Sequence, residues 1–286
     1  MNEEVFAAAN EALARGETVA LVTIVRAQGS TPQRVGAKML VYADGRTVGT
    51  IGGGCYEHDA FWKARDAIAS GTPSLLRYEL NDDFAQENGL VCGGQMEVYI
   101  EPLTAAPRLY IIGAGHVGWH LGRLAQEIGF RIHVVDDREK FANAERFPGA
   151  EIAVDDIPAW LATAELPADA FVTIVTRGHQ HDLSALRALA NRPLQYLGMI
   201  GSRAKVTRVY DALVQEGIPA DVLRRVHAPI GLDLGAVTPA EIAVSIIAEM
   251  VAVRHGRDRE AASKPLRYPP RQKGDSHTSP PVAGKV

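Results

Sequence analysis

The chain has 286 residues, of which 47% are hydrophobic and 22% charged, a composition that excludes a fibrous or a disordered protein. Its net charge of −4 argues against phosphate-backbone binding, so we expect no nucleic-acid partner. The sequence lacks both an apolar stretch of the roughly 20 residues that cross a bilayer and the basic start of a signal peptide, so we expect a cytoplasmic protein with no membrane partner and two reduced cysteines.

The first hundred residues mix helical and strand patterns. We predict a helix near 3–14, a strand at 19–26, a hairpin whose Asp44-Gly45 turn links 39–42 to 47–51, a helix at about 55–69, and strands near 75–80 and 96–100. This mixed order predicts an α+β domain over residues 1–104.

Three consecutive glycines, Gly52, Gly53 and Gly54, separate the hairpin from the next predicted helix, which starts with Cys55 and contains Glu57. We expect the bare amides at this helix start to face an anion, and the same field would stabilise a thiolate on Cys55. Cys55 is therefore a candidate soft ligand or sulfur acceptor.

The second cysteine, Cys92, is followed by Gly93 and Gly94 and then by a predicted strand. If the fold brings Cys55 and Cys92 together, two thiols with backbone donors suit a soft metal–sulfur group that has a phosphate tail. Both cysteines are thus candidate metal ligands. The alternative is a pair of tight turns in which the cysteines only fill space.

Two prolines within residues 101–108 break the pattern, and strands then alternate strictly with helices. We predict strands at 109–112, 131–135, 151–154, 171–175 and 195–200, helices at 116–128, 182–190 and 203–216, a short helix before 151 and another helix after 154. This order predicts a Rossmann-like parallel sheet over residues 108–258. The predicted fold class is α/β, with an N-terminal α+β domain followed by this Rossmann-like domain.

A G-x-G-x-x-G motif links the first of these strands to its helix, the context in which the motif indicates a dinucleotide site. Gly113 would permit the tight turn, Gly115 the approach of a pyrophosphate, and Gly118 the packing of helix on strand. His116 is a further candidate binding residue of this motif.

Asp136 ends the second strand, where its carboxylate is expected to accept hydrogen bonds from the ribose of NAD or an adenosine. Arg138 nearby is compatible with a 2′-phosphate, so the choice of cofactor stays open. The alternative is a Rossmann scaffold that binds no nucleotide. Further along, His179, His181 and Asp182 follow a strand, and we interpret them as ligand hydrogen-bonding groups more readily than as a metal site.

The tail, residues 259–286, is rich in proline and poor in apolar periodicity, which predicts disorder. It is basic, so the rest of the chain carries a larger negative charge than the whole. We interpret the tail as a solvated segment; a docking segment for an acidic partner is the alternative.

Several motifs together resemble the XdhC/CoxI family. In the first half these are Gly29-Ser30-Thr31-Pro32, Gly49 to Glu57, and Cys92-Gly93-Gly94; in the second half they are Gly113 to Gly118, Gly201-Ser202-Arg203, Pro229 to Asp233, and Thr238 to Ala243. The resemblance covers residues from about 17 to 255 and is greatest to xanthine dehydrogenase accessory proteins. The tail after Arg257 matches no pattern of the family.

The resemblance implies a chaperone more than a turnover enzyme, with no catalytic residue assigned. Such proteins bind molybdenum cofactor (molybdopterin), assist its sulfuration with a cysteine desulfurase, and deliver it to apo xanthine dehydrogenase or a related molybdenum hydroxylase. Carried over, Gly52–Cys55 with Glu57 and Cys92–Gly94 form the cofactor site. Gly113, Gly115, Gly118 and Asp136 take NAD(P) or another nucleotide, including the dinucleotide form of the cofactor, and Pro229–Asp233 closes this second site.

Two other functions remain open. The chain is alternatively an NAD(P)-dependent oxidoreductase of a small substrate that uses polar groups such as His179 or Asp182, or an interaction protein gated by a nucleotide in which the thiols have no part. A homodimer is the default expectation for a soluble two-domain protein.

Overall fold

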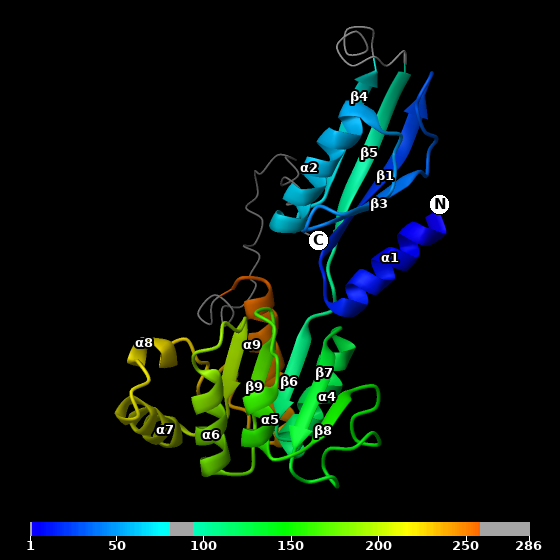
Figure 1. Ribbon diagram of the computed structural model, residues 1–286. Helices are drawn as coiled ribbons and strands as arrows, with labels where there is room; N and C mark the ends of the chain where they lie inside the picture. The colour runs from blue at the N-terminus through cyan, green and yellow to red at the C-terminus, as the bar shows by residue number, and fades with distance from the viewer. Residues whose placement is uncertain (1, 81–93, 258–286) are drawn as a thin grey trace, which may run out of the picture. The chain divides into compact units, whose positions relative to one another are not determined.

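The computed structural model describes residues 2–80 and 94–257 of the chain. The chain divides into two compact units (Figure 1): unit 1 comprises Met1–Leu109 with Gln126–Ile132, and unit 2 comprises Tyr110–Ala125 with His133–Val286. Cys92, Gly93 and the predicted disordered tail from residue 259 lie outside the described residues. Among the helices of the described ranges, none has the length and apolar character needed to cross a membrane.

Unit 1 is built on an antiparallel sheet with the strand order β3-β2-β1-β5-β4. Its strands are β1 (Val19–Gln28), β2 (Lys38–Tyr42), β3 (Thr47–Gly49), β4 (Ser74–Leu80) and β5 (Gly94–Leu103). The central strand β1 pairs with β2 along one edge and with β5 along the other. The predicted hairpin turn joins β2 to β3, where Gly45 has a φ of 94° that favours glycine.

Two helices cover opposite faces of this sheet, because successive side chains of a strand point to opposite sides. Ala20, Val22 and Ile24 of β1 belong to the core under α2 (Gly54–Ser70), whereas Val19 and Leu21 belong to the core under α1 (Asn2–Arg15). On α2 the buried side chains are Tyr56, Ala60, Ala64 and Ala67, which share one helical face. This packing fixes the first turn of α2, which carries Cys55, against the sheet.

Unit 2 contains a five-stranded sheet in the order β10-β9-β6-β7-β8, with β9 and β10 parallel and β7 and β8 parallel. The strands are β6 (Arg108–Ile112), β7 (Arg131–Asp136), β8 (Glu151–Val154), β9 (Phe171–Ile174) and β10 (Tyr196–Met199). The first strand, β6, is central, so the chain runs outward to β8 and then crosses back to β9. Ligands of such sheets bind at the carboxyl ends of the strands near this reversal.

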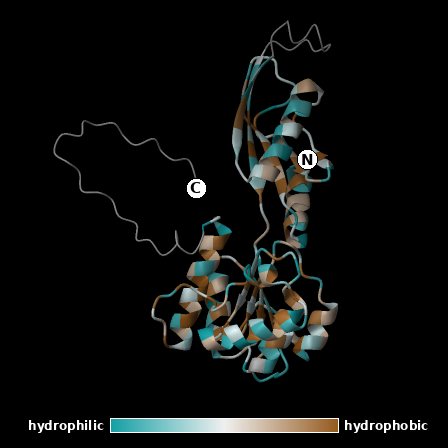
Figure 2. Ribbon diagram, turned by 90° about the vertical axis from the view of Figure 1, so that its left-hand side faces the viewer, coloured by the Kyte–Doolittle hydropathy of each residue, from teal (hydrophilic) through white to brown (hydrophobic). Residues whose placement is uncertain are grey.

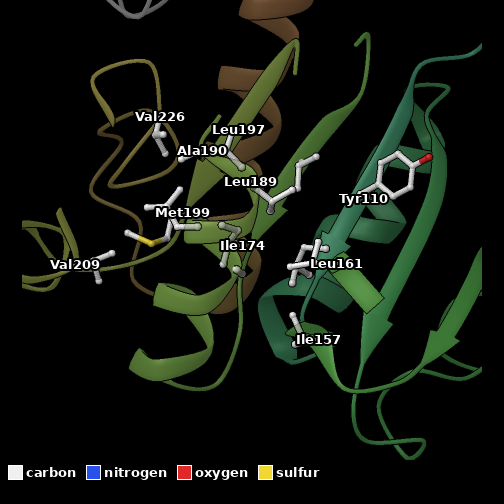
Figure 3. Packing of buried hydrophobic residues seen from close by; sticks show 14 of the residues in the cluster. Tyr110, Ile157, Leu161, Ile174, Leu189, Ala190, Leu197, Met199, Val209 and Val226 are labelled. Atoms are coloured by element: carbon white, nitrogen blue, oxygen red, sulfur yellow. The ribbon is translucent and has the colours of Figure 1, made fainter. Parts of the chain in front are cut away.

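The helices of unit 2 pack their apolar faces on this sheet. They are α4 (His116–Glu127), α5 (Ile157–Thr163), α6 (His179–Leu189), α7 (Arg203–Gln215), α8 (Ala220–Leu223) and α9 (Pro239–Arg254). Figure 3 shows Ile174 of β9, Met199 of β10, Leu189 of α6 and Val209 of α7 within one buried cluster. Hydrophilic and hydrophobic residues alternate around the helices in Figure 2. The predicted fold class is confirmed.

The structure differs from the sequence prediction in several elements of unit 2, among them the unpredicted short helix α8. Residues 137–150, for which we predicted a short helix, form turns instead. Side chains in this segment bond to its backbone, as when Arg146 Nε donates to the carbonyl of Phe141 at 3.0 Å, and Pro148-Gly149 ends it. Conversely, we did not predict α9, although Thr238 and Glu241 form a capping box at its start and Pro239 follows the cap.

Candidate functional site

The glycine turn of unit 1 lies between β3 and α2, and it requires its glycines. Gly52, Gly53 and Gly54 have φ values of 124°, 78° and 80°, in the region that side chains disfavour. A Cβ at Gly52 would also lie 2.9 Å from Cβ of Pro32 and 2.8 Å from the Tyr56 hydroxyl. A Cβ at Gly53 would meet nothing within 4 Å, so the backbone of Gly53 is open.

The carboxylate of Glu57 holds this turn in place. Its Oε2 accepts hydrogen bonds from the amides of Ile51 at 2.8 Å, Gly52 at 3.1 Å and Gly53 at 3.0 Å, and from the Thr50 hydroxyl at 2.5 Å. Burial alone would raise the pKa of Glu57, but the bonds from Thr50 and the three amides outweigh it and lower the pKa. The amides that we expected to face an anionic ligand therefore donate to a side chain of the protein itself.

This arrangement changes the role predicted for Glu57 and adds a residue that we missed. Glu57 positions the turn from inside, and Thr50 shares its carboxylate. A glutamate in the first turn of a helix that follows glycines is a known stabiliser of a helix start, and this signal was available in the sequence. Cys55, two residues before Glu57, is half-buried at the start of α2.

Segments far apart in the sequence meet around this turn. A Cβ at Gly94, the first residue of β5, would lie 2.5 Å from the carbonyl oxygen of Gln28 and 2.6 Å from that of Ser30. The same loop continues to Pro32, which contacts Gly52. The loop after β1 thus connects the glycine turn to the start of β5, and Gly94 lies at the far side of that loop.

The second predicted thiol, Cys92, and its neighbour Gly93 lie outside the described residues. Within residues 2–80 and 94–257, no three side chains of histidine, cysteine, aspartate or glutamate gather closely enough to hold a metal ion. The predicted pairing of Cys55 with Cys92 stays a prediction.

The glycine turn of unit 2 gives its three glycines three different surroundings. A Cβ at Gly113 would lie 2.6 Å from the carbonyl oxygen of Val175, and one at Gly118 would lie 2.2 Å from that of Gly113. These two glycines permit close backbone contacts. A Cβ at Gly115 would meet nothing within 4 Å, and His116 beside it is exposed. Open space over Gly115 is what the approach of a pyrophosphate needs.

The side chain of Asp136 bonds to other groups of the protein, whereas we had expected it to face a ribose. Asp136 is 2% exposed, and it accepts hydrogen bonds from the Ala114 amide at 2.8 Å and from Arg138 Nε at 2.7 Å and Nη2 at 2.9 Å. Burial acts to raise the pKa of Asp136, but the bonds from Arg138 and Ala114 outweigh it and lower the pKa. Asp136 thus joins the glycine turn to the residues that follow β7.

A second polar cluster lies where β9 and β10 end. The Thr176 hydroxyl donates to Asp182 Oδ1 at 2.6 Å, and Lys205 of α7 forms an ion pair with the other carboxylate oxygen. Burial raises the pKa of Asp182, while Lys205 and Thr176 act against that rise. We expected Asp182 to serve a ligand but missed Lys205, because only the folded chain brings these residues together.

A pocket of about 820 Å³ opens beside β10. It is lined by Ile200–Arg203, by the loop Pro229–Ala236, and by Ile242 and Ser245 of α9. Buried Glu249 of α9 anchors the loop by accepting from the Gly231 amide at 2.9 Å and the Tyr196 hydroxyl at 2.6 Å. We had expected this loop to close the site at Gly113. It borders β10 instead, β9 lies between β10 and β6, and no residue of 113–118 lines the pocket.

In comparisons with known proteins, family models match segments of both units. The family model described as the XdhC Rossmann domain matches residues 109–250, and the model described as the XdhC and CoxI family matches residues 12–79. The uncharacterized protein YqeB of Escherichia coli (strain K12) is 36% identical over 248 residues, which are 86% of this chain but only 45% of YqeB. This chain thus spans less than half the length of that relative.

Two further proteins match over most of their length. The molybdenum cofactor insertion chaperone PaoD of Escherichia coli (strain K12) is 26% identical over 287 residues, with 89% of each chain covered. A crystal structure described as a xanthine dehydrogenase from Bacillus halodurans is 26% identical, covers 89% of this chain and 96% of its own, and has a TM-score of 0.50.

Proposed function

The chain belongs to the XdhC and CoxI family, and on that premise we propose that it binds molybdenum cofactor and inserts it into xanthine dehydrogenase or a related molybdenum hydroxylase. The similarity to PaoD and to the Bacillus halodurans protein supports this proposal. Molybdenum cofactor is the cargo of the chain, and the hydroxylase is its client.

One observation supports a cargo site in unit 1. The loop after β1 contacts Gly94 through Gln28 and Ser30 and the glycine turn through Pro32, so it links segments that are far apart in the sequence. Glu57 holds the turn rigid, and Cys55 lies half-buried in the helical turn that follows. A soft sulfur ligand beside open backbone suits a metal–sulfur group, because molybdenum in such cofactors is bound through sulfur.

We also propose that the second thiol takes part. Cys92 precedes Gly94, the first residue of β5, by two positions in the sequence. In this proposal Cys55 and Cys92 hold the cargo together with Gly93, the cofactor is sulfurated with a cysteine desulfurase, and the chain acts as a cytoplasmic homodimer.

For unit 2 we propose a nucleotide site at the glycine turn. Open space over Gly115 and the exposed His116 at the start of α4 support it. The ligand in this proposal is NAD(P) or another nucleotide, and Asp136 shapes the turn from behind through its bond to Ala114.

A second candidate function, an NAD(P)-dependent oxidoreductase, is favoured by the cluster of Thr176, Asp182 and Lys205. These side chains lie at the carboxyl ends of β9 and β10, where the substrates of such sheets bind. A buried carboxyl group next to an ammonium group can exchange protons with a substrate. A change in nicotinamide absorbance with a small carbonyl or hydroxy substrate, lost in Lys205→Met, would favour this function over the first.

A transfer assay tests the proposed function. Apo xanthine dehydrogenase and molybdenum cofactor are mixed with and without the chain, and recovery of hydroxylase activity is followed. We expect the full chain to speed activation at least tenfold, and Cys55→Ala to remove that gain because the soft ligand is lost. Asp66→Ala, an exposed residue of the same helix, should keep it. Equal activation by Cys55→Ala and the unchanged chain would contradict a role of this thiol.

A further inference from the structure

Positively charged side chains gather beside the glycine turn of unit 2. The charged groups of Arg138, Lys140 and Arg146 lie 4.1, 5.3 and 5.3 Å from the centre of the Phe141 ring. The guanidinium of Arg146 also lies 5.6 Å from the ring centre of Trp119. The guanidinium of Arg123 lies 5.2 Å from the centre of that same ring. We refer to Arg123, Arg138, Lys140 and Arg146 as the cationic cluster.

Acidic residues alternate with these cations along residues 136–146, and two of them take part in ion pairs. Arg138 pairs with Asp136 at 2.7 Å, and the neighbouring Asp137 is engaged by Arg177 at 2.7 Å. For Arg123, Lys140 and Arg146, no ion pair forms with any other residue of 2–80 or 94–257. Cations that hold no ion pair with another described residue favour the binding of an anion beside them.

The cluster is joined directly to the turn that is proposed to hold the pyrophosphate. Arg146 Nη2 donates to the carbonyl of Ala114 at 3.3 Å, and Trp119 follows Gly118 on α4. Arg138 and Lys140 come just after Asp136, the last residue of β7. In a dinucleotide site, the ribose of the adenosine lies at the end of this second strand. The cations therefore lie where the 2′ position of that ribose would be.

The contacts of Asp136 also favour a ligand with a 2′-phosphate. An acidic residue at this place selects NAD by accepting a hydrogen bond from the ribose 2′-hydroxyl. Here Asp136 is 2% exposed, and its carboxylate accepts from the Ala114 amide and twice from the Arg138 guanidinium. Its acceptor capacity is taken up inside the protein, and its negative charge is balanced by Arg138. It neither binds a 2′-hydroxyl nor repels a 2′-phosphate.

We propose that unit 2 binds a dinucleotide whose adenosine ribose carries a 2′-phosphate, of the NADP(H) type, in preference to NAD(H). This inference rests on the nucleotide site of the proposed function and names its ligand class. Lys140 and the guanidinium groups of the cluster bind the extra phosphate by charge-assisted hydrogen bonds. The aromatic and guanidinium faces beside it provide surfaces on which an adenine ring stacks.

Calorimetric titration of the full chain tests the preference. NADPH is compared with NADH, and adenosine 2′,5′-bisphosphate with AMP, since the members of each pair differ only in the 2′-phosphate. We expect the 2′-phosphorylated ligand of each pair, NADPH or the bisphosphate, to bind at least about tenfold more tightly. This is the gain of one good charge-assisted contact. Equal or reversed affinities within both pairs would overturn the preference while leaving a nucleotide site. Absence of binding by all four ligands would overturn the nucleotide site itself, and with it the preference.

Substitution of Lys140 tests the recognition of the 2′-phosphate most directly, because this side chain is exposed and holds no ion pair among the described residues. Lys140→Ala should weaken the binding of NADPH and the bisphosphate about tenfold and leave NADH and AMP unchanged. Lys140→Arg keeps the positive charge and should keep the preference for the 2′-phosphate. Lys63→Ala makes the same change at an exposed position of α2 in unit 1 and should have no effect on binding. Equal weakening of all four ligands by Lys140→Ala would contradict recognition of the 2′-phosphate.

Discussion

Replacing Glu57 with alanine is expected to lower the free energy of unfolding of unit 1 by about 3 kcal/mol and to release the glycine turn. The substitution removes one acceptor from the amides of Ile51, Gly52 and Gly53 and from the Thr50 hydroxyl. Each partly buried donor left without a partner costs about 1 to 3 kcal/mol, and water recovers part of that cost here because the site is half-buried. Hydrogen exchange of the peptide that spans residues 50–57, read by mass spectrometry, measures the release.

Two controls separate the hydrogen bonds from the change of side chain. Glu57→Gln keeps a carbonyl oxygen that accepts from some of these donors, so it should destabilise the turn less than alanine does. Asp66→Ala removes an exposed carboxylate from the same helix and should leave exchange at residues 50–57 unchanged. Unchanged exchange in Glu57→Ala would show that the turn does not depend on this carboxylate.

The glycines of unit 2 should separate into one that is needed for folding and one that is needed for binding. Gly118→Ala places a methyl group 2.2 Å from the Gly113 carbonyl oxygen and 3.2 Å from Ile111, and backbone cannot move aside cheaply. We expect a loss of about 3 kcal/mol or more from the free energy of unfolding of unit 2. Urea denaturation followed by circular dichroism measures that loss.

Gly115→Ala is the matched partner of that experiment. Its methyl group meets nothing within 4 Å, so the variant should unfold at the same urea concentration as the unchanged chain. Binding of NADPH should fall at least tenfold, because the methyl group lies where a pyrophosphate approaches the backbone. A stable Gly118→Ala variant, or full affinity in Gly115→Ala, would contradict the roles assigned to these two glycines.

Much of the architecture follows from local patterns in the sequence. The apolar run of β1 and the Asp44-Gly45 turn predicted the first sheet, and strict strand–helix order predicted the second. The motif from Gly113 to Gly118 was recognisable because a strand and a helix flank it. Each of these patterns spans only a few residues, so it can be recognised without the tertiary structure.

The partners of the polar side chains were not predictable in the same way. Asp136 ends a strand, as a ribose-binding acid does, but its burial and its bonds to Ala114 and Arg138 depend on how the turn folds over it. The pair of Asp182 and Lys205 joins residues 23 positions apart on two helices. Such contacts are set by packing between elements, which periodicity and spacing do not encode.

The molybdenum and pterin content of the full chain tests the central claim, that the glycine turn of unit 1 with Cys55 holds the cargo. The chain is incubated with molybdenum cofactor and separated from free cofactor by gel filtration, and both contents are measured per chain. We predict stoichiometric molybdenum and pterin in the unchanged chain and in Gly115→Ala, and loss of both in Cys55→Ala. Full retention by Cys55→Ala together with loss in Gly115→Ala would contradict the account, because the cargo would then depend on unit 2.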